Sequence, residues 1–229
     1  MARVAALYDV HGNQPALDAA LADVAREEFD LIVCGGDVVS GPMPAAVLDA
    51  LVGQPLPVLW VDGNADREVR EGAVPWVAER LGDAHRARLA RLAPTVEADG
   101  VLFCHATPRS DTELLTAITP EDDVTAVVAR TGTVVCGHVH AQYDRVIGPL
   151  RLVNAGSVGL PYEGRPGAFW LELVDGAPRH RRSDYDVDAA EEAIRATGYP
   201  DADELIAESL RGGVGSAEVA AFFEGRRGP

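Results

Sequence analysis

The strongest constraint on the fold is a repeated alternation of short apolar runs and segments with helical periodicity. The runs RVAALYD, DLIVCGGD and LPVLWVDGN are typical of buried strands. Between the first two, residues 14–30 place their apolar side chains on one helical face, with Asn13 as the expected N-cap and Pro15 in the first turn. This alternation predicts βαβ-like units in the first part of the chain.

The pattern continues and then changes character. Two helical segments are expected in residues 66–92, a strand at VLFCH, helical material in residues 111–129 and a strand at TVVCGH. After Gly137 the runs QYDRVIG, LRLVNAG, GAFWLELV and PRHRRSDY are separated by Gly and Pro with little helix between them, which predicts antiparallel pairing. Helical patterns return from about Val187. We therefore expect a single domain over residues 1–229, an α/β fold with a mixed sheet or two packed sheets in residues 1–183 and a helical C-terminal extension in residues 184–229.

Composition excludes several functions. The formal net charge is −16, and such a surface repels nucleic acid, so non-specific binding of DNA or RNA is not expected. All 20 basic residues are Arg, which excludes a Schiff-base Lys, a pyridoxal-phosphate anchor and a P-loop Lys. A local cationic centre, such as a metal cluster, would still attract an anionic substrate.

The cysteines and the hydropathy pattern bear on location. The chain has three Cys, no apolar run of transmembrane length and no expected signal peptide at its start, which favours the cytoplasm, free thiols and no membrane association. Each Cys closes an apolar strand just before a polar site residue, and we expect these thiols to pack beneath the site.

Side chains suited to metal binding follow the predicted strands, at the points where the strands end. They are Asp9, His11, Asp37, Asn64, His105, His138 and His140. Since such strand ends open into one crevice in α/β folds, these residues can converge in space. Each has a simpler explanation alone: Asp-x-His pairs are common at surfaces, and a single buried His is usually structural. His138 and His140 stand two apart and would point to the same side of an extended chain, as a ligand pair or as polar edge residues.

The combined pattern is more specific, because four of the six His stand at these strand ends. Neutral imidazoles together with oxygen ligands suit Mn, Fe, Zn or Ni. Seven ligands exceed the needs of one catalytic metal with an open position, and they fit two divalent metal ions that share a bridging carboxylate.

Six motifs carry a resemblance to a known family. They are DVHGN (9–13), GGDVVSGP (35–42), GNADRE (63–68), CHATPR (104–109), GHVH (137–140) and NAGSVGLP (154–161). As a set they resemble the calcineurin-like metallophosphoesterases, and the last resembles the small bacterial and archaeal branch with phosphodiesterase-like members. The resemblance implies a four-layer α-β-β-α sandwich of two mixed sheets flanked by helices.

The resemblance also implies an assignment of ligands. The first metal would take Asp9, His11 and His140, the second would take Asn64, His105 and His138, and Asp37 would bridge them. A water or hydroxide between the metals would attack phosphorus in line. The residues expected to take part in catalysis are Asp37, Asn64 and His105, together with Asp66, which we expect to orient a ligand or the turn.

Three further residues are candidates for contact with a small phosphoester substrate. Arg67 and Arg109 follow ligand residues closely and would fork onto a phosphate, although surface ion pairing would equally explain them. Asn13 would contact the phosphate or simply cap its helix. The loop around Tyr162 and Arg165 and the C-terminal helices are expected to shape substrate choice, while the oligomeric state is left open.

One position departs from the family pattern. Many relatives carry His directly after the ligand Asn, where it protonates the leaving group or stabilises the transition state, and this chain has Ala65. Loss of a general acid costs roughly 10²- to 10⁴-fold for a poor leaving group. His85 is not expected to replace it, and His180 is expected at the surface. The favoured function is therefore phosphodiester hydrolysis. The alternatives are a phosphomonoesterase, acting on proteins or nucleotides, and a non-catalytic protein-binding scaffold, which would tend to lose ligands that this chain keeps.

Overall fold

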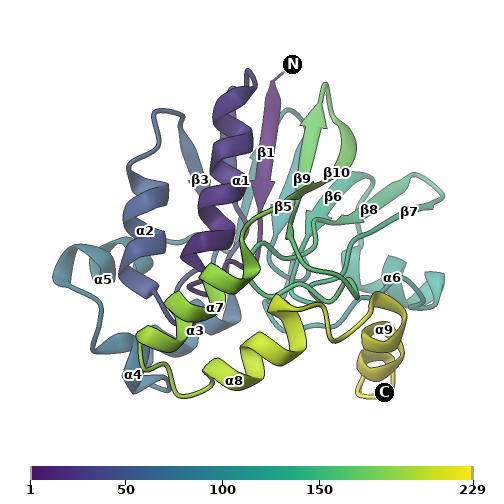
Figure 1. Cartoon of the computed structure of the whole chain (residues 1–229). Coiled ribbons are helices and arrows are strands. Elements are labelled where there is room, and N and C mark those ends of the chain that lie inside the picture. The colour runs from purple at the N-terminus through teal and green to yellow at the C-terminus, as the bar shows by residue number, and fades with distance from the viewer. Residues whose placement is uncertain (1, 228–229) are drawn as a thin grey trace.

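The computed structural model describes residues 2–227, and Figure 1 shows two sheets packed between layers of helices. The first sheet has the strand order β10-β9-β1-β2-β3, in which β1, β2 and β3 are parallel and β9 and β10 are antiparallel additions. Its strands are β1 (Arg3–Leu7), β2 (Leu31–Cys34), β3 (Val58–Trp60), β9 (Ala168–Val174) and β10 (Ala177–Ser183).

The second sheet has the order β4-β5-β6-β8-β7. Strands β5, β6 and β8 are parallel, and β4 and β7 pair antiparallel at the two edges. Its strands are β4 (Thr95–Ala98), β5 (Val101–Cys104), β6 (Gly132–Cys136), β7 (Tyr143–Ile147) and β8 (Leu150–Asn154). The predicted pair of mixed sheets is thereby confirmed.

Helices cover the sheets and then extend past them. They are α1 (Gln14–Arg26), α2 (Pro44–Val52), α3 (Asn64–Arg70), α4 (Pro75–Ala78), α5 (Asp83–Leu89), α6 (Glu121–Val128), α7 (Val187–Ala196), α8 (Ala202–Leu205), the π-helix η1 (Ile206–Leu210) and α9 (Ser216–Glu224). In Figure 1, α7 and α8 cross the end of the molecule toward which β1 runs. Within residues 2–227, no helix is long and apolar enough to span a bilayer.

Alternation along β1 explains the layers. Ala5 and Leu7 are buried against the helices α1 and α2, whereas Val4 and Ala6 are buried between the two sheets. A third apolar cluster joins the outer face of the second sheet to α6. Each sheet therefore buries both of its faces, which produces the α-β-β-α sandwich.

Three details of local structure differ from the expectations. Strand β4 was not foreseen; it forms a hairpin with β5 through Asp99 and Gly100, whose φ values of 48° and 77° suit a tight two-residue turn. The dipeptide Asp-Gly was the available signal. Only Glu121–Val128 is helical within residues 111–129, because hydroxyls compete for the preceding backbone: Thr119 Oγ1 accepts from the Thr116 amide at 2.8 Å. Residues 66–92 form three short helices rather than two.

Candidate metal centre

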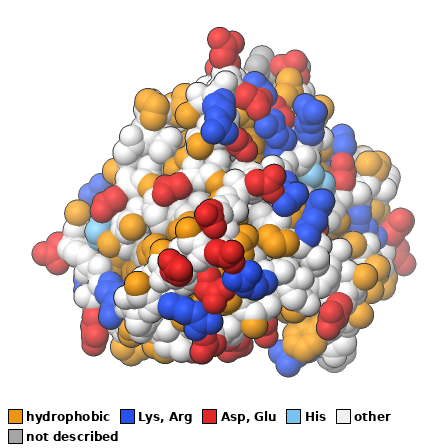
Figure 2. Space-filling view, viewed as in Figure 1, with side chains coloured by type: hydrophobic (Ala, Val, Ile, Leu, Met, Phe, Trp, Pro, Cys, Tyr) orange, Lys and Arg blue, Asp and Glu red, His pale blue; other side chains and the backbone are white. Residues whose placement is uncertain are grey.

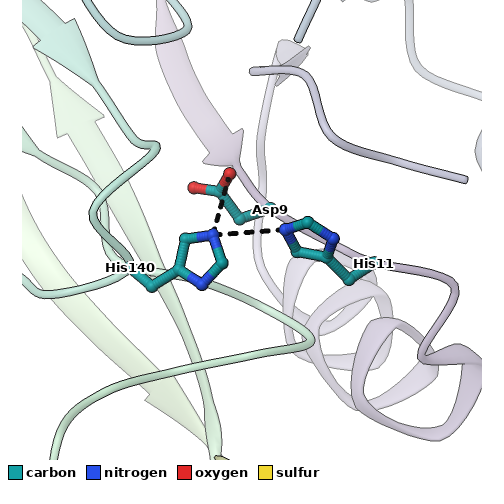
Figure 3. Close-up of side chains that lie close together, drawn as sticks. All are labelled: Asp9, His11 and His140. Atoms are coloured by element: carbon teal, nitrogen blue, oxygen red, sulfur yellow. Dashed lines mark hydrogen bonds and ion pairs between the residues drawn. The ribbon is translucent and has the colours of Figure 1, made fainter. Parts of the chain in front are cut away.

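The structure brings the predicted ligands together at one end of the sandwich. Asp9 and His11 follow β1, Asp37 follows β2, and Asn64 begins α3 directly after β3. The histidines from the second sheet, His105, His138 and His140, follow β5 and β6. Two groups result, Asp9 with His11 and His140 (Figure 3), and Asp37 with His105 and His138. Within each group the ligand atoms lie within 4.8 Å of one another.

The backbone at these ligands is unusual. Five of the seven have positive φ: Asp9 (53°), His11 (45°), Asp37 (53°), His138 (68°) and His140 (56°). Residues other than Gly seldom adopt this left-handed region, and they persist there when the surrounding structure holds them. The expectation that the last two histidines lie on an extended chain and point to one side was therefore wrong. Each left-handed residue turns the chain, so the two rings enter different groups.

Close packing of glycines supports this conformation. A Cβ atom on Gly63 would lie 2.1 Å from Oδ1 of Asp37, and one on Gly137 would lie 2.4 Å from Oδ2 of Asp9. The backbone amide of His11 donates to the carbonyl of Asp37 at 2.9 Å. The two ligand loops of the first sheet are thus tied to each other.

Backbone carbonyls orient all four imidazoles. One ring nitrogen of each lies near a carbonyl oxygen: Nδ1 of His11 with Ser40 (3.2 Å), Nδ1 of His105 with Gly35 (3.0 Å), Nδ1 of His140 with Leu160 (2.8 Å) and Nε2 of His138 with Thr112 (3.3 Å). A carbonyl only accepts, so this nitrogen carries the proton of a neutral ring. The other nitrogen then presents its lone pair to the centre, as in metal-ligating histidines.

In the first group, atoms with lone pairs face one another. Nε2 of His140 lies 3.2 Å from Nε2 of His11 and 3.5 Å from Oδ1 of Asp9 (Figure 3). This carboxylate oxygen is buried and has no hydrogen-bond partner among the described residues. A buried, unpaired charged oxygen is costly unless a cation neutralises it. The group therefore fits a bound cation.

The second group shows the same arrangement. Oδ1 of Asn64 lies 3.1 Å from Nε2 of His105 and faces only acceptor atoms, including Nδ1 of His138. If a cation lies between Asn64, His105 and His138, it favours the orientation in which the oxygen of the Asn64 amide, rather than its nitrogen, faces the two imidazoles. Oδ2 of Asp37 is 3.3 Å from Nε2 of His105 and 3.7 Å from Nε2 of His11, so it lies between the two groups.

The electrostatics match these contacts. Burial, together with the neighbouring His140, lowers the pKa of His11, and burial together with His105 lowers the pKa of His138 to about 4. For His105, burial opposes the charged form but the carboxylate of Asp37 outweighs it and raises the pKa to about 10. Without a cation, Nε2 of His105 thus holds a proton against Asp37. A metal ion would compete with this proton.

Comparison with known proteins identifies the family. Residues 2–176 match the calcineurin-like phosphoesterase superfamily domain. The chain belongs to this superfamily. The resemblance that the motifs carried is confirmed. Calcineurin-like phosphoesterases use divalent metals, and the chain has two candidate groups to hold them.

Solved structures share this fold. A metallophosphoesterase from Sphaerobacter thermophilus has a TM-score of 0.77 and 22% identity, covering 92% of this chain and 99% of its own. A hypothetical protein from Pyrococcus horikoshii OT3 has a TM-score of 0.80 and 20% identity, covering 93% and 100%. An archaeal phosphodiesterase has a TM-score of 0.51 and 14% identity, covering 79% and 99%. No curated protein matches the chain in sequence.

In this calcineurin-like chain, Asp66 holds the backbone next to the predicted ligand Asp37. Its buried Oδ1 accepts hydrogen bonds from the backbone amides of Val38 at 2.9 Å and Val39 at 3.0 Å. These two residues directly follow Asp37 in the sequence. Burial and the charge of Asp37 raise the pKa of Asp66 to about 7. Asp66 therefore orients the turn that carries Asp37.

The three residues considered for phosphate binding have protein partners here. Asn13 is fully buried; its Oδ1 accepts from the Ala16 amide at 3.2 Å and its Nδ2 donates to the Gly159 carbonyl at 2.9 Å, so it caps α1. Arg67 donates through Nε to Asp111 at 2.7 Å, and Arg109 donates through Nη2 to Glu113 at 2.6 Å. Both arginines thus form surface ion pairs, which was the alternative to phosphate binding. Their contact with phosphate stays a prediction.

The remaining His and Cys lie outside the two groups. His85 lies on α5, where Nε2 is 3.0 Å from a carboxylate oxygen of Asp49, and His180 is exposed on β10. The three thiols are free and buried, and they pack beneath the site as expected. Burial raises the pKa of each, to about 12 for Cys136, which makes them poor nucleophiles.

The motif NAGSVGLP has a supporting role that sequence reasoning did not assign. Nδ2 of Asn154 donates to the Gly137 carbonyl at 2.6 Å, and Oγ of Ser157 donates to the Asp9 carbonyl at 2.7 Å. Tyr162, shortly after the motif, stacks on His140 with ring centroids 5.2 Å apart and planes 19° apart. The segment thus braces ligand loops of both sheets.

Proposed function

We propose that this chain is a phosphoesterase that works with two divalent cations, Mn, Fe, Zn or Ni, and acts mainly on phosphodiesters. The observation that carries the proposal is the convergence of two ligand groups with Asp37 between them. One group, Asp9 with His11 and His140, would hold the first cation. Asn64, His105 and His138 would hold the second, and Asp37 would contribute to both.

The reaction follows from what such a centre provides. Two divalent cations held by these residues would supply charge that neutralises phosphate oxygens and lowers the pKa of a water molecule. That water would lose a proton to solvent, and its oxygen would bond to phosphorus in line with the departing alkoxide. The P–O bond to the alkoxide would break, and the alkoxide would take up a proton from solvent. The protein fixes the imidazoles through backbone carbonyls and fixes Asp37 through the Ala65 amide at 2.8 Å. Held in this way, the ligands need little rearrangement during the reaction.

Ala65 underlies the preference for diesters. Its side chain offers no acid to the departing oxygen. His85 on α5, which was considered as a substitute, has its Nε2 3.0 Å from a carboxylate oxygen of Asp49 on α2. Esters whose leaving group needs little protonation are therefore favoured. The name of the solved archaeal phosphodiesterase, which shares the fold, is in line with this preference.

The test compares 4-nitrophenyl phosphate with bis(4-nitrophenyl) phosphate, using protein purified without chelator and then supplied with Mn, Ni, Fe, Zn or Mg in turn. We expect turnover of both esters and a higher kcat/KM for the diester. No turnover of either ester with any metal would overturn the enzymatic proposal. A strong preference for the monoester would overturn only the part concerning diesters and would favour a phosphomonoesterase.

A further inference from the structure

A cavity of about 230 Å³ lies directly beside the first ligand group. His11 and Tyr162 line it on the side of the metal centre, and residues of the C-terminal extension line the other side. These latter residues lie outside the stretch 2–176 that matches the superfamily domain. The cavity therefore lies between the first ligand group and the C-terminal extension.

The extension contributes an acidic wall. Asp201, Glu204 and Glu208 line the cavity, and none of them forms an ion pair with another side chain in residues 2–227. No arginine is among the described residues that line it. Figure 2 shows acidic side chains gathered over the C-terminal helical segment, with some arginines beside them. Three unpaired carboxylates disfavour a polyphosphate or any other anionic substituent at this place.

Two aromatic rings also line the cavity. Tyr162 is held by its stacking on His140, and Tyr199 packs edge-on against Trp76 with ring centroids 5.1 Å apart. Burial and the charges of Glu208 and Glu204 raise the pKa of Tyr162 to about 12. Tyrosine faces next to carboxylates are the groups that proteins use to bind organic cations.

The backbone of this wall is locally unusual. Glu208 and Ser209 belong to the π-helix η1, a rare conformation that is frequent at functional sites. Ser209 lines the cavity, is fully buried, and its Oγ has no hydrogen-bond partner among the described residues. A buried hydroxyl without a partner is uncommon in folded proteins and is explained here by a partner that enters the cavity.

We propose that this cavity binds one alcohol substituent of the phosphodiester, and that this substituent carries an ammonium or trimethylammonium group. The inference rests on the proposed function. The carboxylates of Glu204 and Glu208 neutralise the cation, Tyr162 and Tyr199 contact its alkyl groups, and Ser209 offers a hydrogen bond. The cavity is smaller than the 300 Å³ or so at which drug-sized ligand sites begin, which suits an alcohol of a few carbons.

The test uses two esters with the same 4-nitrophenolate leaving group. One carries choline as its second substituent, and the other carries 3,3-dimethylbutanol, which has the same shape without the charge. We expect kcat/KM to be about tenfold higher for the choline ester, as a cation–aromatic contact with added carboxylates would give. The variant E204Q/E208Q is expected to lose this preference.

The matched control is Glu192→Gln, which removes one charge from exposed Glu192 on α7, outside the cavity lining. It is expected to keep the preference. Equal rates on the two esters in the wild type, or a preference that survives in E204Q/E208Q, would overturn the inference.

A second measurement separates this inference from the proposed function. Choline is titrated into metal-free protein, and the ring resonances of Tyr162 and Tyr199 are followed by NMR. We expect saturable shifts that E204Q/E208Q abolishes. Turnover of neither ester, with choline binding retained, would overturn the proposed function and leave the cation site standing. Absence of choline binding in that case would overturn both.

Discussion

The carboxylate of Asp37 faces the imidazole of His105, with Oδ2 3.3 Å from Nε2. The same oxygen is 3.7 Å from Nε2 of His11 in the other group. We expect Asp37→Asn to bind fewer metal ions per chain and to lose at least about 100-fold in kcat/KM, because it removes a carboxylate that lies between the groups. Metal analysis and diester hydrolysis measure this. Asp184→Asn, at an exposed carboxylate, is the control. Two bound metals and full activity in Asp37→Asn would contradict the bridging assignment.

A substitution at Gly63 tests whether the position of the Asp37 carboxylate matters for metal binding. A Cβ there would lie 2.1 Å from Oδ1 of Asp37 and 2.3 Å from its amide nitrogen. We expect Gly63→Ala to displace Asp37, to destabilise the fold by about 1–3 kcal/mol and to reduce metal content. Urea unfolding and metal analysis provide the readouts. Gly215→Ala, where a Cβ meets nothing within 4 Å, should change neither.

Ala65 predicts a dependence on leaving-group acidity. In the wild type, log kcat/KM should fall steeply as the pKa of the departing phenol or alcohol rises, because the side chain of Ala65 supplies no general acid. Ala65→His should flatten this slope, and Ala65→Gln, of similar size without a titrating proton, should not. A series of 4-substituted phenyl diesters measures the slope. Equal slopes in all three proteins would show that leaving-group protonation does not limit the reaction.

Metal binding should stabilise the fold. The buried, unpaired Oδ1 of Asp9 and the opposed nitrogens of His11 and His140 are costly without a cation. At a metal concentration of about 100 Kd, one bound ion adds about 2.7 kcal/mol, which raises the Tm by about 5–10 °C in a chain of this size. Thermal unfolding with and without EDTA measures the change. His140→Ala should reduce it, and an unchanged Tm in the wild type would contradict a site in the native fold.

A buried ion pair far from the centre predicts how stability depends on pH. Glu172 is buried, and although burial opposes its charge, hydrogen bonds from Arg181 at 2.8 Å and Arg3 at 2.7 Å lower its pKa. Its contribution to stability is therefore complete above the ordinary pKa of about 4.5 and is lost as the pH falls through the lower folded value. Glu172→Gln should be less stable than the wild type at pH 7, and this difference should shrink below pH 4. A difference that does not change with pH would contradict the pairing.

Periodicity predicted an α/β fold with either one mixed sheet or two packed sheets, and the family resemblance implied the two sheets. Alternation in β1 and the helical face of α1 both follow from the need to cover each sheet on two sides. Strand β4 and the hydroxyl-bonded turns around Thr116 were not predicted, because local hydrogen bonds rather than the hydrophobic pattern decide the conformation there.

For the site, residue type and place at strand ends predicted which side chains converge. Their directions did not follow, because the left-handed φ of His138 and His140 breaks the alternation that an extended chain would have. The ion-pair partners of Arg67 and Arg109 could not be predicted from the sequence either. An arginine on a surface finds whichever carboxylate lies near it in space, here Asp111 and Glu113.

Each ligand group joins residues from both sheets: His140 completes the set begun by Asp9, and His138 completes the set begun by Asp37. During synthesis on the ribosome, the early ligands emerge long before these two histidines. A nascent or truncated chain that ends before them has no complete group and should bind cations weakly. Metal loading is thereby delayed until both sheets have formed, and metal content becomes a measure of how much of a preparation has finished folding.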